Sequence, residues 1–176
     1  GENPSIKGLS EGEVISTSSL LYPLLLESSN AAAKTLADHI GTKNFVNYMN
    51  GEAGSIGLPK TFFADSSGLS SRNISTPEDL FKFVSSLFKN KKQILDITRK
   101  KEFEEGMKKW ANGGKFSGLE NFLGGKTGYT DSAGQTFAGV FSLPSAESSP
   151  REIAIIILKS RDRDDDVIKI LDYLKQ

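Results

Sequence analysis

The sequence contains no cysteine and a single histidine, His39, among its 176 residues. The absence of thiols excludes disulfides and cysteine-ligated metal sites, and one imidazole argues against a histidine-based metal centre. An excess of charge is also absent, because 22 Lys and Arg side chains balance 22 Asp and Glu side chains. Without a global positive field, we expect no nucleic-acid partner. No apolar run approaches the length of a membrane-spanning helix.

The sequence shows no signal segment, but it begins with Gly1 rather than Met. We interpret this start as a cut or processed end, so the missing signal says little about the compartment. The absence of cysteine agrees with an extracytoplasmic protein without proving one. The length is sufficient for one domain with a hydrophobic core.

The order of the apolar patterns predicts an α+β fold in one domain. Helical spacing dominates residues 17–97, and strand-like or turn-rich segments follow over residues 98–160. A last apolar stripe predicts a C-terminal helix over residues 162–175, packed on the strands. The acidic run 162–166 suits the N-terminus of that helix, which explains the run more simply than a metal site does.

Three polar residues, Ser28, Ser29 and Asn30, lie between two apolar patterns with helical spacing. Serine and asparagine are common helix caps, and capping is the interpretation that local evidence favours. The alternative is that a rigid helix junction directs these polar side chains into a cleft. The residues alone leave both interpretations open.

The stretch from Gly124 to Thr130 predicts a short strand that holds a fixed cation. Thr127 and Tyr129 favour a strand, and the neighbouring glycines leave its backbone uncovered. Lys126 supplies a positive charge and Thr127 a hydroxyl, and both suit an anionic ligand. Free N–H groups on such an edge can pair with a peptide or hold an oxyanion. The alternative is a tight turn that enters a strand.

Ser28-x-Asn30 at a helix junction and Lys126-Thr127-Gly128 on a strand resemble, in this order, two of the three motifs of serine acyl-transferases with the penicillin-recognising fold. The surrounding sequence is similar to that of the D-alanyl-D-alanine carboxypeptidases, the low-molecular-mass penicillin-binding proteins. The similarity runs from about Gly12 to the end of the C-terminal helix. It includes Leu20 to Ala32, Ser67-Gly68-Leu69, Ser75-Thr76 with Asp79-Leu80, and Gly125 to Thr130 with Ala133-Gly134.

The resemblance implies a β-lactamase/penicillin-binding-protein-like transpeptidase domain, of which this chain is a part. It implies serine-type acyl-enzyme chemistry without a cofactor, on a peptidoglycan stem peptide that ends in D-Ala-D-Ala. It further implies that the intact domain takes β-lactam antibiotics, and that the protein acts in the periplasm or cell envelope.

The resemblance also assigns roles to residues. Ser28 would relay a proton to the leaving amine, and Asn30 would hydrogen-bond the peptide carbonyl and hold the catalytic lysine. Lys126 and Thr127, with Gly128 on the same strand, would bind the terminal carboxylate. The backbone N–H of Tyr129 would be one arm of the oxyanion hole. Each role agrees with the chemistry of its residue.

The sequence departs from the family at the nucleophile, because no Ser-x-x-Lys precedes Ser28. Ser86 and Lys89 have this spacing, but they come late and face away from the apolar stripe of their helix, so we interpret them as a coincidence. A second Ser-x-Asn, from Ser71 to Asn73, lies in a loop region. The chain would then be a fragment, the partner of a separate segment, or a non-catalytic relative that binds peptidoglycan. A β-lactamase-like hydrolase is a weaker alternative.

The apolar run from Ile153 to Leu158 predicts a strand buried on both faces. In the family this strand pairs with a first strand that the present sequence does not show. An open apolar edge is a site for pairing with another chain, so we expect self-association through residues 153–159.

Overall fold

The computed structural model describes residues 6–10, 12–145 and 149–175. Six α-helices and five strands fill these ranges, together with one short 3-10 helix, η1. The helices are α1 (Thr17–Leu26), α2 (Asn30–Ile40), α3 (Thr42–Ser55), α4 (Pro77–Asn90), α5 (Lys92–Thr98) and α6 (Arg163–Leu174). The other elements are β1 (Glu102–Glu105), β2 (Lys108–Ala111), η1 (Lys115–Gly118), β3 (Phe122–Thr130), β4 (Gly134–Leu143) and β5 (Arg151–Ser160).

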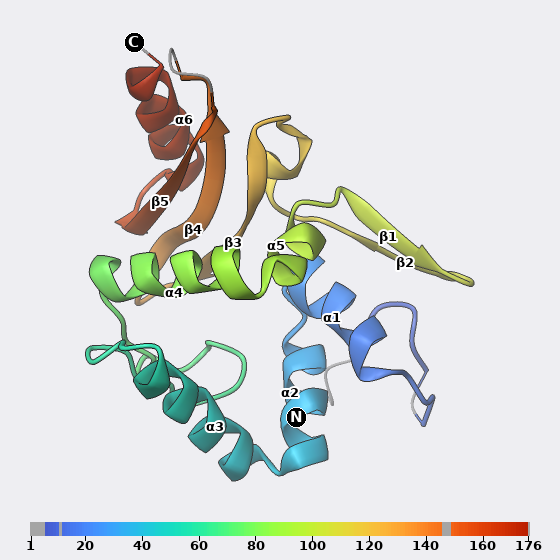
Figure 1. The fold of residues 1–176 in the computed structure, drawn as a ribbon. Helices are drawn as coiled ribbons and strands as arrows, with labels where there is room; N and C mark the ends of the chain where they lie inside the picture. The colour runs from blue at the N-terminus through green and yellow to red at the C-terminus, as the bar shows by residue number, and fades with distance from the viewer. Residues whose placement is uncertain (1–5, 11, 146–148, 176) are drawn as a thin grey trace.

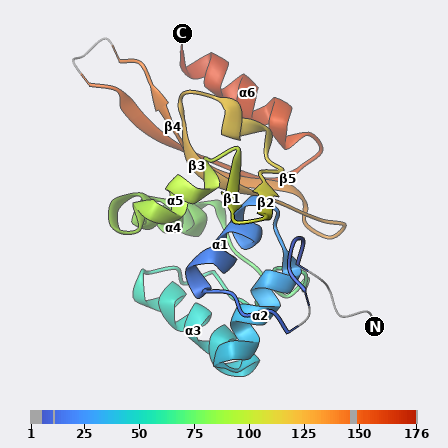
Figure 2. The same ribbon diagram turned by 90° about the vertical axis from the view of Figure 1, so that its right-hand side faces the viewer.

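The centre of the fold is an antiparallel sheet with the strand order β3-β4-β5. Helix α6 covers one face, while α4 and α5 lie against the other, as Figures 1 and 2 show together. Helices α1 to α3 form a separate group beyond α4, and the hairpin β1-β2 projects from the side of the molecule (Figure 1). This arrangement confirms the predicted α+β class.

Two apolar cores join the sheet to its helices. On the α6 side, Val167 and Leu171 pack with a cluster of phenylalanines that includes Phe137 and Phe141. On the other side, Val84 of α4 and Leu95 of α5 pack against Val140. Because β4 contributes to both cores, the sheet is fixed from two sides, and the edge strand β3 is held in place beside the helical group.

The ends of the helices follow their sequence signals. Thr76 caps α4 and is followed by Pro77 at the first helical position, as the sequence predicts. Asp162 caps α6 by accepting a hydrogen bond from the backbone of Asp165, which confirms that the acidic run stabilises a helix N-terminus. Within the described ranges, no group of three or more His, Cys, Asp or Glu side chains is placed to hold a metal ion.

The strand β5 differs in part from its prediction. Ile153 and Ile157 pack on the α6 side and Ala154 and Ile156 on the α4 side, so both faces are covered. Only Ile155 is fully buried, however, because β5 lies at the edge of the sheet and pairs with β4 alone among the strands described. No described helix is both long and apolar enough to cross a membrane.

Self-association through residues 153–159 stays a prediction, and light scattering over a concentration series tests it. We expect the mass to rise with concentration, and we expect Leu158→Lys to suppress the rise because a charge on an edge strand opposes pairing. Leu119→Lys is the matched control, since Leu119 is 38% exposed and Leu158 39%. A wild-type chain that stays monomeric at high concentration would contradict the prediction.

Candidate active site

Ser28 occupies a strained turn between two helices. Helix α1 ends at Leu26 with Glu27 as its cap, and α2 starts at Asn30, so two residues separate Glu27 from α2. Ser28 has φ +54°, a left-handed conformation that side chains other than glycine seldom adopt. This conformation turns the chain sharply and leaves the Ser28 side chain exposed. A strained residue between two helices is typical of a functional position.

The three polar residues of this junction have different roles. Ser29 caps α2 by accepting a hydrogen bond from the backbone N–H of Ala32, so the capping interpretation is correct for Ser29. Ser28 is not the cap of either helix; it lies against a residue from the distant sheet. Asn30 is the first residue of α2 and is exposed.

Lys126 of β3 meets Ser28, and its ammonium group donates a hydrogen bond to the Ser28 hydroxyl. The same ammonium donates to the backbone carbonyl of Thr127 at 3.0 Å. Burial, and to a smaller extent the nearby charge of Arg163, together lower the pKa of Lys126 to about 8. The sequence motifs Ser28-x-Asn30 and Lys126-Thr127-Gly128 are therefore brought together in space.

The backbone of β3 directs several N–H groups towards its outer edge, away from β4. Register with β4 pairs Lys126 with Ala138 and Gly128 with Thr136. The N–H of Gly125 points away from β4, towards the outer edge, and donates to Thr98 Oγ1 of α5 at 2.9 Å. Because backbone groups alternate in direction along a strand, the N–H groups of Thr127 and Tyr129 face the same outer edge as that of Gly125.

A groove of about 850 Å³ runs along this edge, between β3 and the helical group. Its lining includes all six predicted site residues, and also apolar side chains of α1 and α3. A smaller cavity of about 160 Å³ adjoins Ser28, Lys126 and Thr127 on the side of α5 and the 3-10 helix. The six predicted residues are Ser28, Asn30, Lys126, Thr127, Gly128 and Tyr129.

The opposite wall of the groove is a loop over residues 64–73 that is fixed by its own polar contacts. The Asp65 carboxylate accepts hydrogen bonds from the backbone N–H groups of Ser67, Gly68 and Ser70. Burial opposes ionisation of Asp65, but these three bonds outweigh it and lower the pKa of the carboxyl. The Asn73 amide oxygen accepts from the backbone of Ala64 at 2.7 Å. The second Ser-x-Asn thus builds the groove wall, a role that its loop position did not indicate.

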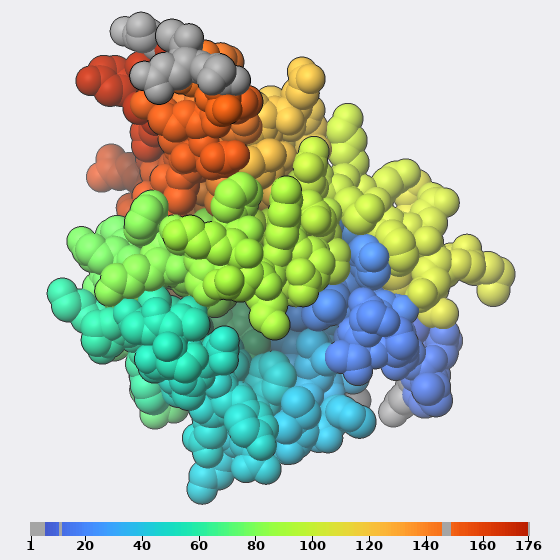
Figure 3. Space-filling view, viewed as in Figure 1, coloured from blue at the N-terminus to red at the C-terminus, as the bar shows by residue number. Residues whose placement is uncertain are grey.

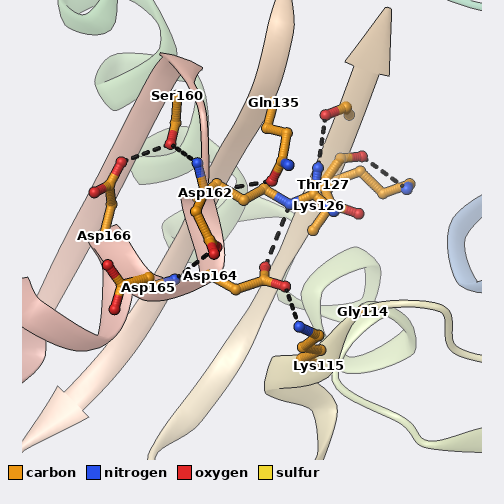
Figure 4. A network of polar contacts seen from close by, with 12 residues as sticks. Gly114, Lys115, Lys126, Thr127, Gln135, Ser160, Asp162, Asp164, Asp165 and Asp166 are labelled. Carbon is orange, nitrogen blue, oxygen red and sulfur yellow. Dashed lines mark hydrogen bonds and ion pairs between the residues drawn. The ribbon is translucent and has the colours of Figure 1, made fainter.

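Arg163 is a residue of the site that sequence reasoning missed. It is the first residue of α6, and its guanidinium donates to the carbonyl of Gly128 at 2.9 Å. Its Nε lies 3.4 Å from the carboxylate of Asp164, which also pairs with Lys115 at 3.1 Å (Figure 4). Arg163 therefore adds a second positive charge behind Lys126 and fixes the strand that holds the motif.

Ser86 and Lys89 do not belong to this site. Lys89 is exposed at the end of α4, and Ser86 lies beside Asn90, which donates to it at 3.4 Å. Neither residue lines the groove or the smaller cavity. Their Ser-x-x-Lys spacing is a coincidence, as the sequence indicated.

Solved structures with the same fold are penicillin-binding proteins. Penicillin-binding protein D2 from Listeria monocytogenes, in its cefotaxime-bound form, has a TM-score of 0.79 and 27% identity. The match covers 98% of this chain and 73% of that one. A D-alanyl-D-alanine carboxypeptidase from Mycobacterium tuberculosis has a TM-score of 0.78 and 28% identity, over 94% of this chain and 66% of that one. The fold is therefore that of penicillin-binding D,D-peptidase domains.

A family model described as D-alanyl-D-alanine carboxypeptidase matches residues 2–160. A D-alanyl-D-alanine carboxypeptidase from a Streptomyces species is 30% identical over 189 residues, which cover 97% of this chain and 64% of the relative. The chain belongs to the D-alanyl-D-alanine carboxypeptidase family. A D-alanyl-D-alanine endopeptidase from Haemophilus influenzae is 46% identical over 72 residues, which cover 40% of this chain and 25% of the relative. The chain therefore spans between about a quarter and two thirds of the length of these curated relatives.

Proposed function

We propose that this chain forms the substrate-anchoring part of a D-alanyl-D-alanine peptidase site that acts on peptidoglycan stem peptides. The observation that supports the proposal most strongly is the contact between Lys126 and Ser28, which joins two motifs of the family across two layers of the fold. The family acts on peptides of the cell wall, so the proposed location is outside the cytoplasm.

In this proposal the terminal carboxylate of the peptide binds to Lys126 and Thr127. A partly buried ammonium attracts a carboxylate more strongly than an exposed one, because fewer water molecules screen the charge. Arg163 contributes a second positive charge behind the strand. The peptide backbone lies antiparallel to the free edge of β3, and the Tyr129 N–H is available to an oxyanion.

Ser28 and Asn30 act on the scissile bond rather than on the carboxylate. The Ser28 hydroxyl, which is in contact with Lys126, passes a proton to the leaving amine. The Asn30 amide, on the groove wall, donates to the carbonyl of the peptide. Gly128 leaves room for the hydroxyl of Thr136, because a Cβ there would lie 2.7 Å from Thr136 Oγ1.

These residues bind and orient a peptide, but none of them is the family's acylated serine. Residues 1–176 contain no Ser-x-x-Lys before Ser28, and Ser86 lies outside the groove. The chain by itself is therefore proposed to bind D-Ala-D-Ala peptides without forming an acyl-enzyme. A binding module for peptidoglycan is the second candidate function, and the same sequence observation favours it. A β-lactamase-like hydrolase is a less favoured third, since no deacylating carboxylate is identified.

Calorimetry with an acyl-D-Ala-D-Ala peptide tests the anchoring function. We expect the free acid to bind at least about tenfold more tightly than the same peptide with an amidated C-terminus, because only the acid pairs with Lys126. A fluorescent penicillin tests the chemistry in parallel, and no covalent label is expected on this chain.

The peptide-binding and penicillin-labelling experiments have separate outcomes that would contradict the proposal. Equal affinity for the acid and the amide would contradict the anchoring function. A covalent penicillin adduct would contradict the claim that the chain has no nucleophile, and mass analysis of the adduct would identify the acylated serine. Release of D-alanine by the chain alone would exclude a pure binding module.

A further inference from the structure

A strip of unpaired positive charge runs from the end of α4 to the start of β1. Residues 89–101 hold six of the 22 Lys and Arg side chains and only one of the 22 Asp and Glu side chains, Asp96, so the rest of the chain is net acidic. All six cations are exposed, and none takes part in an ion pair within the part of the chain that the structure describes. They are Lys89, Lys91, Lys92, Arg99, Lys100 and Lys101.

Helix stability explains only part of this arrangement, because Lys89 in the last turn of α4 and Arg99 at the C-terminal cap of α5 are at favourable positions for a cation. Lys91 is the N-terminal cap residue of α5 without a side-chain cap hydrogen bond, and Lys92 is the first residue of that helix. Cations at a helix N-terminus oppose the helix dipole, so both positions are unfavourable for α5. Lys92 gains only a contact with the ring of Phe88, 5.8 Å from its centre. Cations at the start of α5 are therefore unfavourable for that helix, and a local conflict of this kind is typical of a functional surface.

Hydrogen bonds fix the backbone of residues 98–101, which carries the last three cations of the strip. The Asn112 amide donates to the carbonyls of Thr98 and Lys100, and the Asn112 backbone N–H donates to the carbonyl of Lys101. Thr98 also accepts the hydrogen bond from Gly125, next to Lys126. The strip is thus built on the same segment that supports β3.

The shape of the strip is narrow. Helix α5 has seven residues and a length of about 10 Å, and the cations lie at its two ends. The residues of helices α4 and α5 lie across the middle of the face that Figure 3 shows. A line of charge along two consecutive helices fits a thin, flexible chain.

We propose that residues 89–101 are a docking strip for a flexible polyanion that bears a phosphate in each repeat and has no bases. Nucleic acid fits less well, because residues 89–101 contain no aromatic side chain on which a base could stack. A membrane surface fits less well, because cations gathered at the two ends of a short helix form a narrow line rather than a broad, flat basic surface. The strip does not depend on the proposed peptidase function.

Fluorescence anisotropy with labelled linear polyphosphate tests this strip on the full chain. The test variant replaces Lys91, Lys92, Lys100 and Lys101 by Gln, and the control variant replaces Lys34, Lys43, Lys169 and Lys175 by Gln, with the same change in net charge. We expect the test variant to bind at least about tenfold more weakly at low salt. The slope of log affinity against log salt should fall by about 3, at roughly 0.7 for each lost contact.

The comparison ligands decide between sources of negative charge. Affinity for vesicles of phosphatidylglycerol, or for single-stranded DNA of equal charge, should be no higher than for polyphosphate. Tighter binding of either ligand would overturn the proposal, as would equal losses in the two variants or no polyphosphate binding by the wild-type chain. The affinity for an acyl-D-Ala-D-Ala peptide should be the same in the test variant and the wild type, which separates this surface from the groove.

Discussion

Replacement of Gly125 by alanine is expected to destabilise the protein by about 3 kcal/mol or more, because the added methyl group would overlap the backbone of the neighbouring strand. A Cβ at this position would lie 2.6 Å from the Cα of Gly139 and 2.7 Å from the carbonyl oxygen of Ala138. Both are backbone atoms of β4 and cannot move aside without separation of the two strands. Denaturant unfolding measures the loss, and binding of an acyl-D-Ala-D-Ala peptide should fall with it because Lys126 is adjacent.

Gly51→Ala is the matched control, with the same added methyl group. Gly51 lies inside α3, and a Cβ there would meet no atom within 4 Å. The change should stabilise the protein by about 0.5–1 kcal/mol, because glycine is a poor helix former. If Gly125→Ala were as well tolerated as Gly51→Ala, the close packing of β3 on β4 would be wrong.

Replacement of Lys126 by methionine is expected to weaken binding of an acyl-D-Ala-D-Ala peptide by about 2 kcal/mol, or roughly thirtyfold near pH 7. Methionine keeps most of the length of the unbranched side chain but has no charge. Because the pKa of Lys126 is lowered to about 8, wild-type affinity should also fall as pH rises through 8, when the ammonium loses its proton while the carboxylate stays ionised. Calorimetry between about pH 6.5 and 9.5 measures both effects.

The pH profile distinguishes a direct contact between Lys126 and the carboxylate from an effect of the protein's net charge on binding. The methionine variant should show no decline near pH 8, since the group that titrates has been removed. Lys43→Met is the control for net charge, because Lys43 is an exposed residue of α3. A flat wild-type profile, or an equal loss in Lys43→Met, would show that Lys126 does not bind the carboxylate.

Periodicity and cap signals were sufficient for most of the elements. The first helix, the start of α4 at Thr76 and Pro77, and the C-terminal helix all lie within about a residue or two of their sequence signals. The partial burial of β5 could not be predicted. An apolar run shows that a strand packs on both faces, but not whether the strand lies at the centre or at an edge of its sheet.

The proximity of the candidate site residues could be predicted where short motifs name them, and not where contacts join distant elements. Lys126 and Ser28 were found from their motifs, and the groove brings them together as the resemblance implies. Arg163 and Thr98 support the same strand from α6 and α5, and no local pattern connects them to it. The capping rule was correct for Ser29 and wrong for Ser28, because local rules do not include the lysine that meets Ser28 from the sheet.

The pairing of Ser28 with Lys126 also has a consequence for how the protein folds. The two residues are 98 positions apart in the chain. Contacts of such long sequence separation form late, after local helices and hairpins have appeared. The hairpin of β3 and β4 can form early, since its strands are neighbours, but the proposed carboxylate site is complete only once the helical layer has docked on the sheet. Binding of an anionic ligand would therefore report complete folding rather than the formation of either layer alone.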